Sequence, residues 1–142
     1  MNYFAKIVIA AACLALHAHA CAQTYPNKPV RVMVGFAPGA ATDLLARIVS
    51  AKLAEGLGQP LVVENRAGVG GVLANEVVAK AAPDGYTLVL GESGGMAVAP
   101  VMMKNPPYDP RKDFAPIAQV VSVTVLLVAN PSLGAKTLGD LQ

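Results

Sequence analysis

Small and polar residues that directly follow an apolar segment are where this chain could do chemistry. Residues 30–36 are mostly apolar, Pro38 and Gly39 end that run, and Thr42 and Asp43 open an amphipathic pattern. A strand, a tight turn and a helix start leave free backbone N–H groups, which attract an anionic ligand. The small residues of the turn let a ligand approach the backbone closely. The stretch therefore predicts an anion site, with Thr42 or Asp43 as the cap of the helix.

Two side chains near these turns have more than one possible role. Asp43 could cap the helix, contact a ligand or act as a general base in a crevice. Ser93 could donate its hydroxyl to a carboxylate or cap a helix that begins near Met96. Catalysis by this pair would lack an activated nucleophile, because no His, Lys or metal partner stands in the same loops.

Two further glycine-rich turns follow predicted strands, at residues 68–71 and 91–95. The first has the pattern Gly-x-Gly-Gly, which differs from the Gly-x-Gly-x-x-Gly of dinucleotide sites, and no Gly-Lys-Ser/Thr phosphate loop occurs. These glycines could serve a ligand, or only tight turning and close helix packing. We therefore expect no cofactor.

The first 22 residues are typical of a secretory signal peptide. Lys6 precedes a short apolar core at residues 7–16, and residues 18–20 or 20–22 offer a small-x-small cleavage site. The apolar core is shorter than the roughly 20 residues that span a bilayer. We expect cleavage after Ala22 and a soluble, exported protein. The alternative is cleavage after Ala20, which would make Cys21 the first residue and a site for a lipid anchor.

Removal of that segment limits the chemistry of the mature chain. Both Cys and both His residues lie within it, so cleavage excludes a Ser-His-Asp site, a thiolate-zinc site and a disulfide. The loss of Lys6 lowers the formal net charge from +2 to about +1, and the remaining charges are scattered. Nucleic-acid binding needs clustered basic residues, and the chain also has no Trp. We therefore expect no metal site, no catalytic residues and no nucleic-acid partner.

Strand and helix patterns alternate along the chain, which predicts an α/β fold. Such βαβαβ units form a parallel sheet with right-handed crossovers, and their ligand loops lie at the carboxyl ends of the strands. All three glycine-rich turns should therefore meet at one edge. The expected elements are a strand at 30–36, a helix at 42–57 ended by Gly58, a strand at 61–64, a helix at 72–82 and a strand at 86–90.

The rest of the chain is less regular. Residues 100–116 contain five prolines and predict a connection, whereas residues 117–129 are rich in Val and predict one long or two consecutive buried strands. Residues 137–140 resemble a helix start with a capping residue. A helix that begins so near the last residue indicates a truncated chain.

Several short motifs together resemble one family, the substrate-binding proteins of tripartite tricarboxylate transporters, often called the Bug or TctC family. The resemblance runs in order from about Tyr25 to Gln142. Its motifs are Tyr25-Pro26 through Arg31, Phe36-Ala37-Pro38-Gly39 with Thr42-Asp43, Leu57-Gly58-Gln59-Pro60, Val63-Glu64-Asn65-Arg66, residues 68–71, Pro83-Asp84-Gly85-Tyr86-Thr87-Leu88, and Tyr108-Asp109-Pro110 with Asp113-Phe114-Ala115-Pro116.

The resemblance implies a type II periplasmic-binding-protein fold, in which two lobes close on a small carboxylated ligand for delivery to a membrane permease. It implies a signal peptide at residues 1–22, a first α/β lobe at 23–115, and a crossover with the start of an incomplete second lobe at 116–142. The chain would then be the N-terminal portion of a binding protein, not an enzyme. The expected ligand-binding residues are Phe36, Ala37, Gly39, Ala40, Thr42, Asp43, Gly70 and Ser93.

Two departures from the family pattern concern the same loops. Ala40-Ala41 stands where the family commonly has a second Gly-Gly pair, and Gly95 to Pro100 replaces a Thr-His-Ala-x-Asn-Pro-like run. The missing His and Asn remove polar groups near the crevice. Two other interpretations remain: an exported α/β enzyme with Asp43 as base, and a truncated remnant that binds no ligand.

Overall fold

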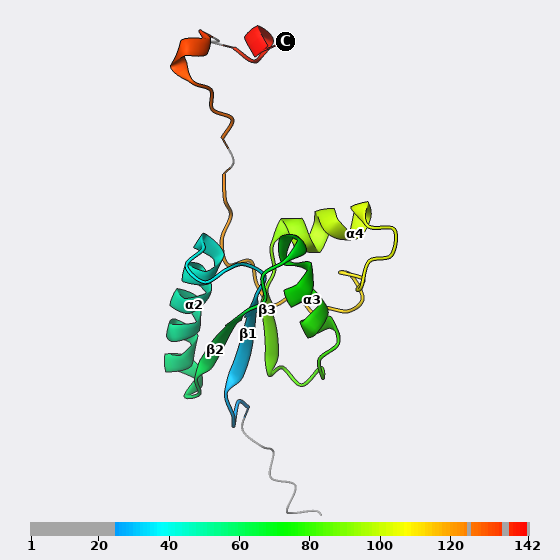
Figure 1. The fold of residues 1–142 in the computed structure, drawn as a ribbon. Helices are drawn as coiled ribbons and strands as arrows, with labels where there is room; N and C mark the ends of the chain where they lie inside the picture. The colour runs from blue at the N-terminus through cyan, green and yellow to red at the C-terminus, as the bar shows by residue number, and fades with distance from the viewer. Residues whose placement is uncertain (1–24, 125, 135–136, 142) are drawn as a thin grey trace, which may run out of the picture.

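The computed structural model describes residues 25–124, 126–134 and 137–141. Its centre is a three-stranded parallel sheet in the order β2-β1-β3 (Figure 1). The strands are β1 Val30–Val34, β2 Leu61–Asn65 and β3 Thr87–Leu90. Val32 lies opposite Val63 on one side and Leu88 on the other, which fixes the register. The predicted α/β class with a parallel sheet is confirmed.

Two helices cover opposite faces of this sheet. The chain moves from β1 to β2 through α2 Ala41–Leu57, and from β2 back past β1 to β3 through α3 Val72–Ala79. Right-handed crossovers in opposite directions place the two helices on opposite faces, as Figure 1 shows. The helix α2 packs on β1 and β2, whereas α3 packs on β1 and β3.

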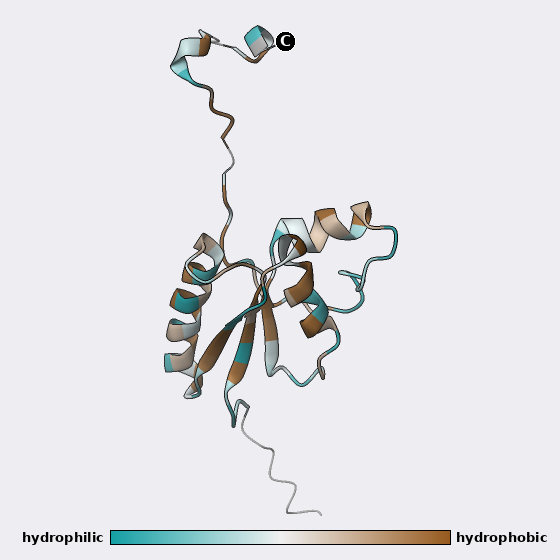
Figure 2. Cartoon of the chain, in the orientation of Figure 1, coloured by the Kyte–Doolittle hydropathy of each residue, from teal (hydrophilic) through white to brown (hydrophobic). Residues whose placement is uncertain are grey.

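The core forms around the central strand. Four of the five β1 residues are buried, and Arg31 is the exposed one. Arg31 is held outside by a two-bond ion pair with Glu64 of β2, at 2.7 and 2.9 Å. The strands are largely hydrophobic in Figure 2. Apolar residues from β1, α2, α3 and a later loop complete the core: Val30, Val32, Met33, Val34, Ala46, Val72, Ala74 and Tyr108.

The element boundaries agree with the sequence to within a few residues. Gly58 ends α2 in the left-handed conformation at φ 67°, as predicted. The helix α3 ends at Ala79, three residues before the predicted end, and β3 begins at Thr87 instead of Tyr86. The turn between them is fixed by side chains, because the Tyr86 amide donates to Asp84 and Tyr25 donates its hydroxyl to the Gly85 carbonyl at 2.7 Å.

Two predictions about the later chain are wrong. Residues 100–116 were expected to hold no element, and 103–116 hold none, but residues 100–102 belong to the short helix α4 Ala99–Met102, which continues the π-helical turn η2 Gly94–Val98. Pro100 fits within this helix because the φ angle that its ring fixes is close to the helical value. The segment 117–129 forms no strand among its described residues and is exposed instead (Figure 1). Strand-forming residues need a neighbouring strand for their backbone hydrogen bonds, and the described residues supply none here.

The last described residues form two single turns, η3 Pro131–Leu133 and η4 Leu138–Leu141. The Thr137 amide donates to the Asp140 carboxylate at 2.8 Å, so the predicted helix start is present as a capped 3-10 turn. The predicted signal segment and Cys21 lie outside the described residues.

Candidate ligand-binding site

The three glycine-rich loops meet at the carboxyl edge of the sheet, as the topology predicts. A Cβ atom on Gly35, after β1, would lie 2.4 Å from the Cα of Gly71, after β2. A Cβ atom on Gly95, after β3, would lie 3.0 Å from the Gly70 carbonyl oxygen. The first distance is shorter than the contacts of real Cβ atoms and the second is at their lower limit, so glycine at both positions lets the backbones approach this closely.

The first loop presents the start of α2. Gly39 turns the chain at φ 84°, and Ala40 is the N-cap residue with no side-chain hydrogen bond. The expected cap at Thr42 or Asp43 is therefore wrong, because the turn at Gly39 starts the helix at Ala41. Among the described residues, the amide groups of Ala41, Thr42 and Asp43 donate to no protein acceptor. Free amides in a first helical turn attract negative charge.

Asp43 is the buried centre of a hydrogen-bond network that joins the first and second loops. Its carboxylate is 1% exposed. One oxygen accepts from the Gly39 amide at 2.9 Å and from Arg47 Nε at 3.0 Å. The other accepts from Asn65 Nδ2 at 2.9 Å and lies 3.0 Å from an Arg47 terminal nitrogen. Asn65 also donates to the Phe36 carbonyl at 3.0 Å.

This network determines the chemistry of Asp43. The Arg47 guanidinium, with the N–H groups of Gly39 and Asn65, holds the pKa of the Asp43 carboxyl well below its usual range. A general base needs a free lone pair and a pKa near the working pH. Asp43 has neither, and its contacts instead fix the shape of the first loop.

The second loop has an unusual backbone. Gly68, Val69, Gly70 and Gly71 all have positive φ, and Val69 does so at φ 48° although it is β-branched. A β-branched residue in this region is strained, and such strain is typical of ligand-binding segments. Gly70 is exposed and has open space around it, whereas Gly71 is buried against Gly35.

The third loop contacts the first through Glu92. The Thr42 hydroxyl donates to the Glu92 carboxylate, so the hydroxyl is already engaged. Ser93, two residues before the buried Gly95, is exposed, has helical backbone angles and makes no capping hydrogen bond. The capping alternative for Ser93 is wrong, because the turn after it is π-helical and begins at Gly94.

Two buried hydrogen bonds in series hold the third loop in place. Asn75 on α3 donates to the Tyr108 hydroxyl at 2.9 Å, and this hydroxyl donates to the Gly95 carbonyl at 2.6 Å. The ring of Tyr108 packs edge-on against Phe114 at 5.5 Å between centroids. The proline-rich connection therefore anchors the turn that carries Gly95.

The predicted site residues share one edge but differ in their surroundings. Ala37, Gly39, Gly70 and Ser93 are exposed, Phe36, Ala40 and Thr42 are half-buried, and Asp43 is buried. Sequence reasoning missed Arg47, Asn65 and Glu92. Arg47 had a signal, because residues four apart share a helix face. For Asn65 and Glu92 the only signal in the sequence was that each follows a predicted strand.

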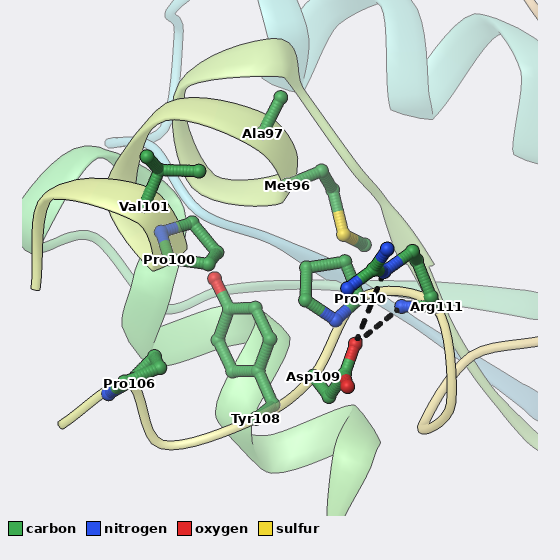
Figure 3. Close-up of a pocket in the computed structure, with 9 residues that line it drawn as sticks. All are labelled: Met96, Ala97, Pro100, Val101, Pro106, Tyr108, Asp109, Pro110 and Arg111. Atoms are coloured by element: carbon green, nitrogen blue, oxygen red, sulfur yellow. Dashed lines mark hydrogen bonds and ion pairs between the residues drawn. The ribbon is translucent and has the colours of Figure 1, made fainter.

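The described surface has a hollow that begins at Met96, just after the third loop (Figure 3). It has a volume of about 510 Å³ and is lined mainly by apolar residues of η2, α4 and residues 106–111. No predicted site residue lines it. Its two charged residues are Asp109 and Arg111, and Arg111 Nε lies 3.9 Å from the Asp109 carboxylate.

The described residues contain no group of three His, Cys, Asp or Glu side chains placed to hold a metal ion. None of the described helices combines the length and apolar character needed to cross a membrane.

A parallel sheet with helices on both faces defines an α/β lobe, and in folds of this kind small ligands bind at the carboxyl edge of the sheet, where this chain has free amides. A family model described as the tripartite tricarboxylate transporter family receptor matches residues 45–142. The chain belongs to this family.

Individual relatives agree with that assignment. BugT of Bordetella pertussis is 44% identical over 121 residues, which cover 84% of this chain and 37% of BugT. The fold is similar to that of MatC from Rhodopseudomonas palustris with bound malate, at a TM-score of 0.72 and 42% identity over 82% of this chain and 40% of MatC. It is also similar to an R. palustris protein solved with adipate, at a TM-score of 0.58 and 39% identity over 61% of this chain and 29% of that protein. The chain thus spans less than half the length of these relatives.

Proposed function

We propose that this protein is a periplasmic solute-binding protein that captures a small organic carboxylate and delivers it to the membrane permease of a tripartite tricarboxylate transporter. The observation that carries the proposal is the set of free amides of Ala41, Thr42 and Asp43 at the edge where three loops meet. Amides in a first helical turn suit a carboxylate. Malate and adipate, bound by two related proteins, are both dicarboxylates.

In this proposal residues 23–115 are the first lobe, and residues 116–142 are the crossover and the start of the second. A ligand carboxylate would lie over residues 36–42, with Gly70 and Ser93 on the neighbouring loops. Closure of the second lobe would then bury the ligand. Asp43 would position the first loop through Gly39, Arg47 and Asn65 and would not contact the ligand through its carboxylate.

The contacts of Asp43 favour a binding protein over the enzyme alternative. Four N–H contacts occupy its two oxygens, and its lowered pKa makes it a poor proton acceptor. An enzyme with Asp43 as base would lose turnover in Asp43→Asn while still binding substrate. A binding protein has no turnover to lose.

The test is calorimetric titration of the full protein, meaning a form of this chain that carries the complete second lobe. The ligands are malate and adipate, and their uncharged diamides are the matched controls. We expect at least one carboxylate to bind and the diamides not to, because the free amide donors recognise negative oxygen atoms. Failure of every carboxylate in a wider panel of small organic acids would refute the proposal and favour a remnant that binds no ligand.

Two glycine variants locate the site. Gly39→Val places a β-branched residue at φ 84°, before the free amides, with no heavy atom within 4 Å to clash with its Cβ. Gly58→Val imposes the same backbone strain at φ 67° at the other end of α2, again in open space. We expect affinity to fall more than tenfold in Gly39→Val only. Equal affinities in the two variants would show that the first loop is only a turn.

A further inference from the structure

Glu92 is a charged group at the proposed site that the carboxylate-binding role does not explain. It follows β3 by two residues and is half-buried. Its carboxylate accepts the hydroxyl of Thr42, the second residue of α2, which places a negative charge beside the free amides of that helix.

Within the described parts of the chain, Glu92 also lacks a counter-charge. The other carboxylate at this edge, Asp43, is paired with Arg47 at 3.0 Å. Across the part of the chain that the structure describes, none of the ion pairs includes Glu92. The start of α2 compensates this charge in part. A partly buried carboxylate is nevertheless better stabilised by a cation with good geometry.

This unpaired charge restricts the ligand. A ligand carboxylate on the amides of Ala41 and Thr42 would lie near the Glu92 carboxylate, and like charges disfavour each other. A ligand with a positive group next to its carboxylate removes that conflict, because the carboxylate can face the amides while the cation faces Glu92. A hydroxyl in the same place could donate a hydrogen bond to Glu92 but would bring no charge.

We propose that Glu92 determines ligand specificity and selects an organic acid that carries an ammonium group beside its carboxylate. The inference rests on the proposed function and narrows its ligand class to amino acids, amino-substituted diacids included. Thr42 has a positioning role, because its hydroxyl holds the Glu92 carboxylate toward the start of α2.

Three diacids with the same four-carbon skeleton test this: aspartate has an ammonium group on C2, malate has a hydroxyl and succinate has neither. We expect the full protein to bind aspartate at least tenfold more tightly than succinate, about 1.4 kcal/mol, with malate between them. In Glu92→Gln the difference between aspartate and succinate should shrink to within about threefold. In Glu92→Lys the order should reverse.

Glu55→Gln is the matched control, because Glu55 lies on the exposed part of α2 in an ion pair with Lys52. It should retain the preference of the parent protein. Equal affinity of the parent for all three diacids would overturn this inference and leave the proposed function intact. A Glu92→Gln variant that binds all three more tightly by the same factor would also overturn it, because Glu92 would then only repel anions. If no organic acid binds the parent, the proposed function fails and this inference fails with it.

Discussion

Replacement of Gly35 by alanine should separate the first two loops of the site. The added Cβ would lie 2.4 Å from the Cα of Gly71 and 3.2 Å from its carbonyl oxygen. Both atoms belong to the backbone, so no side-chain rotation can relieve the overlap. Overpacking of this kind costs about 1–3 kcal/mol. For a domain of this size each kcal/mol lowers the unfolding midpoint by about 4–8 °C.

Gly56→Ala makes the same chemical change where the structure predicts the opposite sign. Gly56 lies within α2, and a Cβ added there has no heavy atom within 4 Å. Alanine in a helix is favoured over glycine by about 0.5–1 kcal/mol. Urea unfolding followed by circular dichroism should therefore show Gly35→Ala less stable than the parent and Gly56→Ala more stable. A Gly35→Ala variant as stable as the parent would refute the close backbone contact between the loops.

Three further predictions concern acid stability, association and export. The pKa of Asp43 is lower in the folded state than in the unfolded state, so its contribution to stability is present at neutral pH. This contribution is lost as the pH falls below about 3.9, the unfolded value. In unfolding curves measured over a series of pH values, Asp43→Asn should lose less stability on acidification than the parent. The exposed apolar side chains between residues 117 and 124 and at residues 126–128, hydrophobic in Figure 2, should make the chain associate. Light scattering should show less association for Val123→Lys than for the control Gln119→Lys, and a monodisperse parent would contradict the prediction. Intact-mass measurement of the exported protein should show loss of residues 1–22, whereas a diacylglyceryl adduct on Cys21 would place the protein on a membrane.

The order of strands and helices could be predicted from the sequence because its causes are local. The apolar run of β1 and the helical spacing in α2 each act within a few residues. The end of α2 could be predicted for the same reason, because the left-handed conformation of Gly58 depends only on its own backbone. Parallel pairing then follows from the alternation of strands and helices, and with it the meeting of the three loops.

The failures concern contacts between distant residues. Segment 117–129 has the composition of a strand, but a strand also needs a partner, and none lies beside its described residues. Asp43 was a candidate cap, ligand contact or base from its own sequence position. Its surroundings depend on Asn65, 22 residues away, and only the folded sheet brings that amide to its carboxylate.

The sequence by itself determined where the three glycine-rich loops lie, because turn residues after buried strands set both the fold and the edge at which these loops meet. Only the tertiary structure decided which polar groups at that edge are engaged and which are free. It placed Glu92 against Thr42 across 50 residues, and among the described residues it gave Asp43 the cation Arg47 and gave Glu92 none. Charge pairing depends on distances in space, and the distance along the chain does not fix them.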